Sequence, residues 1–314
     1  MNKFIIFLLM LVLTISNASV SYAQENEQEK VIKKRPAPIE RAHLVEDYLP
    51  ILGKKMRENG MKPPKPFFVS GIYYHMQIPQ TITNAKGTAP EFGTTEVNVG
   101  MYNAKVKTNS VGMRAGVNLF PFMSVFGVYI YTEGDSYFTA VADGISPSLL
   151  PNGYKLEQKN PFTAHTGAIG TAFSYGYRLG RVIPFAIVNG NYAWSSTDRT
   201  DNLIQTMIVG ARVGLSVPLP KDMKVAFTLG GQYTWMPMGN KVQGTYDVTL
   251  PPNTLYPGAP AQTITSKYTA NAEYASPWTV NAGIAYSFNR YFDVIAEVGF
   301  LTRLTAMVVV QANF

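Results

Sequence analysis

The stretch that decides the fold is the end of the chain, LTAMVVVQANF, residues 304–314. Its residues alternate between two faces. One face carries small or apolar side chains, at Ala306, Val308, Val310, Ala312 and Phe314. The other face carries Thr305, Met307, Val309, Gln311 and Asn313. Because successive side chains of a strand point to opposite sides, this period of two predicts a β-strand that runs to the last residue.

The other end of the chain reads as an export signal. A lysine precedes the apolar run 4–15, and Ser21-Tyr22-Ala23 forms a small-x-small cleavage site. We expect residues 1–23 to be removed, so that the mature protein begins near Gln24 outside the cytoplasm. The chain has no cysteine, which excludes disulfides, thiolate metal sites and a lipoprotein anchor.

The export signal and the last strand together resemble bacterial outer-membrane β-barrel proteins, whose closing strand typically ends in an aromatic residue such as Phe314. The segment 108–132 looks like a hairpin of barrels often labelled as transporters, through Arg114, Asn118, Leu119-Phe120-Pro121-Phe122 and Val125-Phe126-Gly127. The resemblance covers residues 1–23 and 67–314. It implies an outer-membrane location, contact with outer-membrane lipids, and recognition of the last strand by the barrel-assembly machinery.

Composition agrees with a barrel. Although 46% of the residues are hydrophobic, no stretch after the signal reaches the roughly 18 apolar residues of a spanning helix. Strands cross a membrane only when they close into a barrel, because lipid offers no partner for open backbone groups. The net charge of +7 does not indicate nucleic acid in an exported protein, and is better explained by basic loops and affinity for anionic headgroups.

We therefore predict an all-β fold, a transmembrane antiparallel up-and-down β-barrel of about ten strands over residues 67–314. The predicted strands are 67–78, 108–119, 124–132, 162–179, 182–196, 203–217, 223–236, 277–288, 291–301 and 304–314. Short joins alternate with long ones, as expected of periplasmic turns and extracellular loops. Three further segments also alternate, namely 95–107, 242–250 and 262–275. They are either extensions of the strands or an additional hairpin, so twelve strands is the alternative.

Aromatic residues support this topology. The three tryptophans, Trp194, Trp235 and Trp278, fall on outward faces near the extracellular ends of their strands. The opposite rim carries Phe120, Phe122, Phe288, Tyr291 and Phe314. Amphipathic rings favour the headgroup layer, so these residues predict two aromatic girdles.

Residues 24–66 form a periplasmic lead-in. Apolar residues at spacings of three and four predict a short amphipathic helix at 40–58, bent at Pro50, and a Pro-rich linker follows at 61–66. The helix is a periplasmic rider, a membrane-surface clamp, or a plug or floor for the lumen. We favour the plug or floor, because the linker to the first strand is short.

Charged residues are predicted to line the lumen. They are Arg114, Arg178, Arg212, Lys224, Asp293 and Glu297. Buried charges are tolerated when they are paired or hydrated, so these residues form either a clasp across the lumen or a selectivity ring that prefers anions. Small inward residues, among them Gly116, Gly170 and Gly214, either relieve crowding in the wall or leave a water-filled path.

No sequence motif indicates an enzyme. His43, His75 and His165 lack metal-binding spacing, so we expect no metal and no cofactor. His75 and His165 lie near the outer ends of their strands. A loop with Asp135, Ser136 and Asp143 could approach them, and a histidine, a carboxylate and a serine are the parts of a hydrolytic site. Nothing in the sequence fixes the relative positions of these side chains. The expected function is a small channel or structural barrel for passive passage of small solutes. The alternative is a surface-interaction, adhesin-like barrel whose loops bind a partner.

Overall fold

The computed structural model describes residues 48–58, 62–88, 97–142, 155–220, 222–236, 241–250, 252, 257–258 and 260–314. The predicted signal peptide, His43 and Asp143 lie outside these residues. The described elements are α2 (Gly53–Glu58), β1 (Phe67–Thr88), β2 (Val97–Phe120), β3 (Met123–Ala142), β4 (Lys155–Gly176), β5 (Ile183–Thr197), β6 (Ile204–Pro218), β7 (Lys224–Trp235), β8 (Lys241–Leu250), β9 (Gln262–Tyr274), β10 (Trp278–Ser287), β11 (Phe292–Phe300) and β12 (Leu304–Asn313).

Ten of the described strands close into an antiparallel barrel. They pair in the order β1, β2, β3, β4, β5, β6, β7, β10, β11 and β12, and β12 pairs back onto β1. At this seam, Phe67 and Phe314 exchange two backbone hydrogen bonds of 2.9 Å. A closed cylinder leaves no strand edge open to lipid, which is the condition for crossing a membrane with strands. The prediction of a ten-stranded barrel is confirmed.

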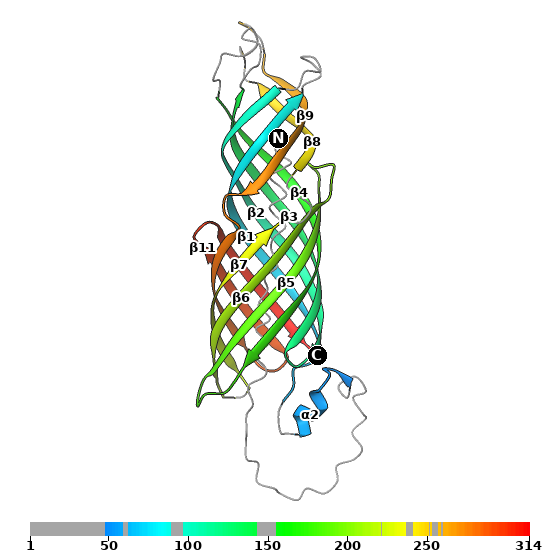
Figure 1. Cartoon of the computed structure of the whole chain (residues 1–314), viewed down its shortest axis with the longest axis vertical. Helices are drawn as coiled ribbons and strands as arrows, with labels where there is room; N and C mark the ends of the chain where they lie inside the picture. Colours follow the sequence, from blue (N-terminus) through cyan, green and yellow to red (C-terminus); the bar gives the residue numbers. More distant parts are fainter. Residues whose placement is uncertain are drawn as a thin grey trace, which may run out of the picture.

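The remaining strands, β8 and β9, form a hairpin on top of the seam. β12 pairs with β1 only as far as Gln77, and β9 pairs with the same edge of β1 from Gln80 upward. β8 then pairs with β9. The alternation at 242–250 and 262–275 is therefore an additional hairpin, and the twelve-strand alternative is wrong for the closed barrel (Figure 1).

The wall is much taller on one side (Figure 1). β1–β4 have 20 to 24 residues, whereas β5–β7 and β10–β12 have 9 to 15. The predicted limits at 78, 132 and 162 were wrong, because higher up the outward positions become polar and the apolar half of the alternation stops. At the start of β2, the alternative that residues 95–107 extend the strand is confirmed over 97–107. We call residues 78–88, 97–108, 132–142 and 155–162, together with β8 and β9, the raised wall.

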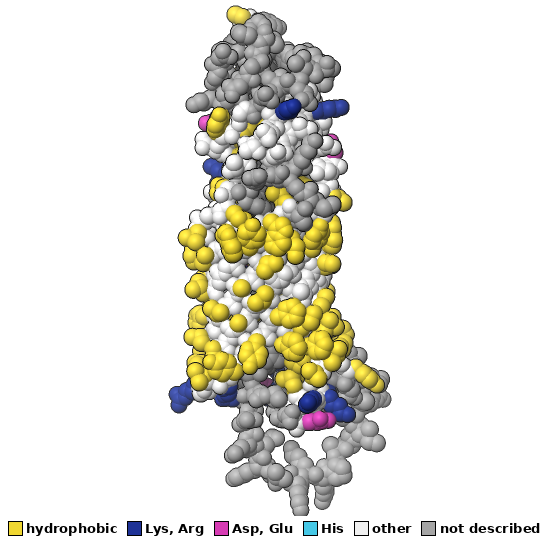
Figure 2. All heavy atoms as spheres, viewed as in Figure 1, with side chains coloured by type: hydrophobic (Ala, Val, Ile, Leu, Met, Phe, Trp, Pro, Cys, Tyr) yellow, Lys and Arg dark blue, Asp and Glu magenta, His cyan; other side chains and the backbone are white. Residues whose placement is uncertain are grey.

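Below the raised wall, each strand has a lipid face and a lumen face. In β6, Val209, Val213 and Leu215 are exposed on the outside, while Arg212 and Ser216 are buried inside. Figure 2 shows hydrophobic side chains in an upper and a lower band around this part of the cylinder. We call this part the belt. It matches the apolar band of roughly 25 Å that outer-membrane barrels present to lipid.

The aromatic residues lie at the two rims of the belt. Tyr233 joins two of the three tryptophans, with its ring centroid 5.5 Å from Trp235 and 4.9 Å from Trp278. Trp194 packs on Tyr192 at 4.9 Å. At the other rim, Phe120 stacks on Phe122 at 5.4 Å, and the remaining rings are exposed, namely Phe288, Tyr291 and Phe314. This rim carries the short turns, and by the rule for bacterial barrels it is the periplasmic end.

The lead-in enters the barrel from below. Helix α2 lies beneath the periplasmic end (Figure 1). The helix predicted at 40–58 with a bend at Pro50 is interrupted over residues 49–52, which form bends and turns, because proline breaks the backbone ladder and Leu52 has a φ of 75°. Residues 40–47 lie outside the described part. No helix of the described residues is long and apolar enough to span a membrane.

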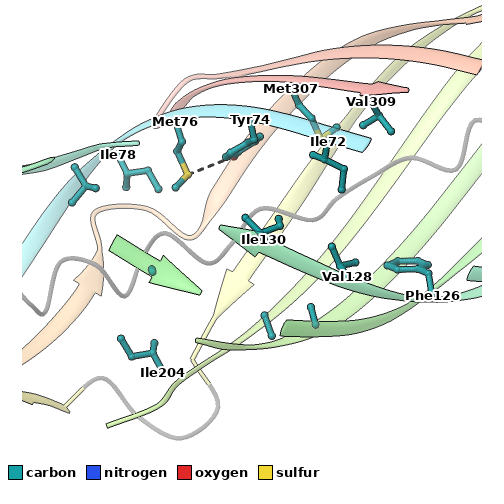
Figure 3. Packing of buried hydrophobic residues seen from close by; sticks show 14 of the residues in the cluster. Ile72, Tyr74, Met76, Ile78, Phe126, Val128, Ile130, Ile204, Met307 and Val309 are labelled. Atoms are coloured by element: carbon teal, nitrogen blue, oxygen red, sulfur yellow. Dashed lines mark hydrogen bonds between the residues drawn. The ribbon is translucent and has the colours of Figure 1, made fainter. Parts of the chain in front are cut away.

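Inside the barrel, apolar side chains share the space with polar ones. Figure 3 shows Ile72 and Met76 of β1, Ile130 of β3, Ile204 of β6 and Val309 of β12 in this interior cluster. All five are buried. The lumen is therefore lined by alternating apolar and polar patches rather than by one continuous polar surface.

Candidate functional site

The lumen holds a buried ion pair between β6 and β11. Arg212 donates from Nε and Nη2 to the two carboxylate oxygens of Glu297, both at 2.8 Å. The exposed fraction of these side chains is 1% and 6%. β7 and β10 separate the two strands in the barrel, so the bridge spans the inner face of these two strands. Such two-pronged guanidinium–carboxylate pairs are the strongest of the charge-assisted hydrogen bonds.

Amides complete this bridge on both sides. Arg212 Nη1 donates to Asn189 Oδ1 at 3.0 Å, and Asn281 Nδ2 donates to Glu297 Oε1 at 3.0 Å. Asn189 lies on β5 and Asn281 on β10, so four strands contribute to one network. The pair is therefore both charge-balanced and hydrogen-bonded, as a buried pair must be.

Glycines make room for the bridge. A Cβ atom at Gly230 of β7 would lie 2.6 Å from Arg212 Cγ and 2.2 Å from the Ala211 carbonyl oxygen. At Gly283 of β10, a Cβ atom would lie 3.6 Å from Glu297 Cβ. The two side chains thus approach each other over strands that have no side chain at these positions.

The other inward glycines are covered by aromatic rings from neighbouring strands. Added Cβ atoms at Gly116, Gly170 and Gly214 would lie 2.3–2.6 Å from the nearest ring atom. The rings are those of Phe68, Phe126 and Phe185, respectively. The idea of a water-filled path was therefore wrong at these positions, where glycine relieves crowding in the wall.

A second arginine, Arg114 of β2, is held differently. It is fully buried, and its guanidinium carbon lies 4.8 Å and 5.4 Å from the ring centroids of Phe68 and Phe126. Its Nη2 donates to Ser70 at 3.2 Å and also to Gln311. Nε and Nη1 have no hydrogen-bond partner among the residues that the structure describes.

The carboxylate nearest to this arginine is reached only through amides. Gln311 donates to Asn313 at 2.8 Å, and Asn313 donates to Asp293 Oδ2 at 2.7 Å. Lys224 acts on Asp293 electrostatically from β7. Cross-strand pairing places Lys224, Ser287, Asp293, Gln311, Ser70 and Arg114 in one row around the barrel.

One predicted lumen residue lies elsewhere, and one was missed. Arg178 is exposed in the turn after β4, where Nε donates to the Gly180 carbonyl at 3.2 Å. β4 ends at Gly176, so the predicted strand was too long. Arg303, between β11 and β12, is buried and donates to the carbonyl oxygens of Ser276 and Pro277 at 3.0 and 2.9 Å. It lies in a turn, where alternation gives no signal.

The inward charges of the belt remain unbalanced. Among the described residues, the cations are Arg114, Arg212, Lys224 and Arg303, and the anions are Asp293 and Glu297. Several inward polar atoms also lack a hydrogen-bond partner within the described part of the chain, including Asn189 Nδ2, Thr206 Oγ1, Ser216 Oγ and Thr279 Oγ1. Buried polar groups in folded proteins are almost always bonded to protein or water.

Residues 62–66, which we call the strap, lie across the periplasmic mouth. The strap contacts turns at different places on the rim: Lys62 pairs with Asp222 at 3.5 Å, Arg290 donates to the Pro63 carbonyl at 3.1 Å, and Asn118 donates to the Lys65 carbonyl at 2.7 Å. Upstream, Ile51 N donates to the Leu119 carbonyl at 2.7 Å. The described lead-in therefore resembles a floor, and residues 48–58 do not plug the lumen.

The predicted hydrolytic residues are not brought together. His165 is exposed on the outside and its Nδ1 lies 2.7 Å from the Tyr129 hydroxyl. His75 contacts Asn109 at 2.9 Å. Ser136 instead points into the barrel and is fully buried. The described residues contain no group of three or more His, Cys, Asp or Glu side chains that could hold a metal.

The raised wall carries a surface cavity of about 310 Å³. It forms where the β5–β6 turn meets the hairpin, since Asp201 N donates to the Gln243 carbonyl at 3.2 Å. Lys86 and Lys267 line it together with hydroxyl side chains such as Thr269. The wall thus offers polar, shaped surface well above the belt.

Comparisons with known proteins give no relative by sequence. No protein-family model and no curated protein matches the chain. Among solved structures, the translocator domain of autotransporter NalP from Neisseria meningitidis is similar over 87% of this chain and 98% of that one, with 12% identity and a TM-score of 0.39. The outer membrane protein OprG from Pseudomonas aeruginosa is similar over 80% and 98%, with 8% identity and a TM-score of 0.38.

The β domain of the Bordetella autotransporter BrkA is similar over 78% of this chain and 99% of that one, with 12% identity and a TM-score of 0.37. Likenesses at this level carry no argument about the site. The architecture itself decides the class: closed strands, a belt exposed to lipid and aromatic rims make this chain an outer-membrane β-barrel.

Proposed function

We propose that this protein is a narrow outer-membrane channel for passive passage of water, ions and small solutes. The observation that supports it is the set of inward polar atoms without a protein partner. Leaving such a group buried and unsatisfied costs about 1–3 kcal/mol each. Water in the lumen removes that cost, so these atoms favour a hydrated interior over a dry, filled one.

The Arg212–Glu297 bridge sets the bore of this channel. It spans the inner face of β7 and β10 and is held at both ends by amides. A bridge of this strength stays closed for most of the time. We therefore expect low conductance, with the bridge as the narrowest point.

Planar-bilayer recordings test the bridge. We expect replacement of both charges, Arg212→Gln with Glu297→Gln, to raise single-channel conductance severalfold, because the change removes the tie without leaving a lone buried charge. The matched control is Asp198→Asn with Arg199→Gln, a partly exposed pair at 3.6 Å in the β5–β6 turn. Equal conductance in the wild type and the bridge variant would contradict the proposal, as would a silent, folded barrel in every variant.

The charge balance predicts selectivity. Within the described ranges, four inward cations face two inward anions, which favours a positive lumen, and a pore lined in this way prefers anions. A salt gradient should therefore give a reversal potential of anion-preferring sign. Lys224→Gln should move it toward zero, whereas the charge-neutral bridge variant should leave it nearly unchanged. A cation-preferring reversal potential would overturn this part of the proposal.

A second function is favoured by the raised wall. Four strands continue past the belt, and β1 among them pairs with the β8–β9 hairpin, building a polar platform with the cavity near Lys86 and Lys267. Polar platforms on rigid strands suit surface recognition. Replacing residues 237–276 by a short turn should abolish surface binding and keep conductance if the wall is an adhesive surface. Loss of conductance with retained binding would favour transport alone.

A further inference from the structure

The outward face of the raised wall carries three lysines around a single tyrosine. Lys105 of β2 and Lys159 of β4 lie opposite Tyr137 of β3 on its two sides. With Lys107, their ammonium groups lie 5.5, 5.9 and 5.8 Å from the Tyr137 ring centroid. The residues between them in sequence, Val106, Ser136 and Phe138, are buried, so the cluster faces outward.

This cluster has more positive than negative charge. Two carboxylates share this outward face. Asp135, opposite Lys107 in the pairing of β2 with β3, pairs with Lys159 at 3.2 Å and accepts a hydrogen bond from the Tyr137 hydroxyl at 3.4 Å, and the exposed Glu157 lies two residues from Lys159 on β4. The hydrogen bond with Asp135 raises the pKa of Lys159, which therefore stays protonated at neutral pH. Lys105 and Lys107 pair with no carboxylate of the described residues. Like charges at such spacing repel, and a bound anion relieves the repulsion.

The height of the cluster selects the kind of anion. The upper boundary of the belt on these strands is a layer of tyrosine and histidine contacts, in which Tyr73 and His75 contact Asn109 and Tyr129 contacts His165. Lys107 is the next outward residue above Asn109. Tyr137 lies six residues above Tyr131 on β3, or roughly 15 Å along the barrel axis for tilted strands.

Lys107, two residues above Asn109, lies roughly 5 Å above the belt and thus within the headgroup layer of the outer leaflet, while Lys105 and Lys159 lie above it. Headgroups extend some 5–8 Å beyond the hydrocarbon in ordinary bilayers, and saccharide headgroups reach further. Cations fixed on an outward barrel face at this level meet lipid headgroups before they meet any soluble molecule. Position and charge together therefore favour a membrane lipid as the occupant.

We propose that Lys105, Lys107 and Lys159, gathered around Tyr137, form a binding site for the phosphate groups of a phosphorylated glycolipid in the outer leaflet. The lysines contact the phosphates as point charges, and Asp135 keeps Lys159 and Tyr137 in place. The site is independent of whether the lumen conducts. It would anchor the tall side of the barrel to its lipid surroundings.

The test measures binding of the refolded mature protein to lipopolysaccharide and to the same material after enzymatic removal of its phosphates. We expect phosphate removal to weaken binding strongly. We expect Lys105→Gln, Lys107→Gln and Lys159→Gln combined to weaken binding to intact lipopolysaccharide on the order of 100-fold, since each lysine near an anionic surface contributes about fivefold.

The matched control replaces Lys54, Lys55 and Lys62 by glutamine, which changes the charge equally at the periplasmic end. It should bind like the wild type. The unfolding temperature in detergent shows that each variant is folded. Equal binding by the two triple variants overturns the proposal, and so does indifference to phosphate removal. If inorganic phosphate alone competes at low concentration, the site takes a soluble phosphate and the assignment to a lipid fails.

Discussion

Two arginines face the same lumen, and each has a carboxylate on β11 as its nearest counter-charge, yet they are held in opposite ways. Arg212 contacts Glu297 directly through two hydrogen bonds. Arg114 is separated from Asp293 by Gln311 and Asn313, and it lies between two phenyl rings instead. Both are almost completely buried.

The difference shows that burial of a charge and pairing of a charge are separate matters. Arg212 and Glu297 depend on each other, because removal of one leaves the other buried without its counter-charge. Arg114 leaves Nε and Nη1 without a protein partner, and Asp293 keeps Asn313 and Lys224 in its absence. The first arginine is a fixed structural tie, and the second is replaceable.

The largest expected effect separates the two arginines directly. Arg212→Met should lower the free energy of unfolding by about 3–5 kcal/mol, because Glu297 is left buried with no cation beside it. Arg114→Met should lower it by no more than about 1–2 kcal/mol, since methionine fills similar space and no carboxylate loses its direct partner. Urea titrations of barrels refolded in lipid vesicles measure both.

Adding Glu297→Met to Arg212→Met is the control for this comparison. The double variant should recover most of the loss, because a buried pair replaced by apolar residues is often close to neutral. If Arg114→Met proves as costly as Arg212→Met, the amides and phenyl rings around Arg114 hold the barrel together as strongly as the direct pair does, and the contrast between the two sites fails.

Adjacent glycines sharpen the same contrast at smaller cost. Gly230 faces the lumen beneath Arg212, and a Cβ atom there would lie 2.2 Å from a backbone oxygen. At Gly231, which faces outward, the nearest atom would lie 3.7 Å away. Gly230→Ala should therefore cost about 1–3 kcal/mol through crowding, and Gly231→Ala should stay within about 0.5 kcal/mol.

Conductance of the glycine variants adds a second measurement. A side chain at position 230 displaces Arg212 from Glu297, so Gly230→Ala should also alter the single-channel current, whereas Gly231→Ala should not. Equal stability and equal current in both variants would mean that the Arg212–Glu297 bridge does not depend on the absence of a side chain at Gly230.

Much of the fold could be predicted from the sequence, because a barrel imposes the same period on every strand. In β7, Phe227 and Leu229 mark the lipid face and Thr228 marks the lumen face, and the structure places them accordingly. The raised wall was underestimated for the same reason. Outward residues such as Lys105 and Tyr137 lie above the lipid, so the apolar signal that marks a strand is missing there.

The site was harder to predict than the fold. Alternation places Arg212 and Glu297 on the lumen face, but it gives no registry between strands that are three apart, so their pairing was invisible. Arg303 was missed and Arg178 misplaced because both lie in turns, where the period of two ends. The predicted helix is interrupted at residues 49–52, because apolar spacing alone ignores the local backbone at Leu52.

The smallest expected effect concerns a third ion pair, Lys62 with Asp222, which holds the strap at the periplasmic mouth. These side chains are 58% and 45% exposed, so water and salt screen their attraction and the pair contributes at most about 0.5 kcal/mol. Lys62→Gln should therefore leave the urea midpoint almost unchanged, like the control Lys54→Gln on α2. The chemistry is the same as in the bridge, a cation beside a carboxylate, and only burial differs. A fall of more than about 1 kcal/mol in the free energy of unfolding of Lys62→Gln would mean that the strap protects this pair from water and salt, as the lumen protects Arg212. The periplasmic mouth would then be more tightly closed than its exposed contacts indicate.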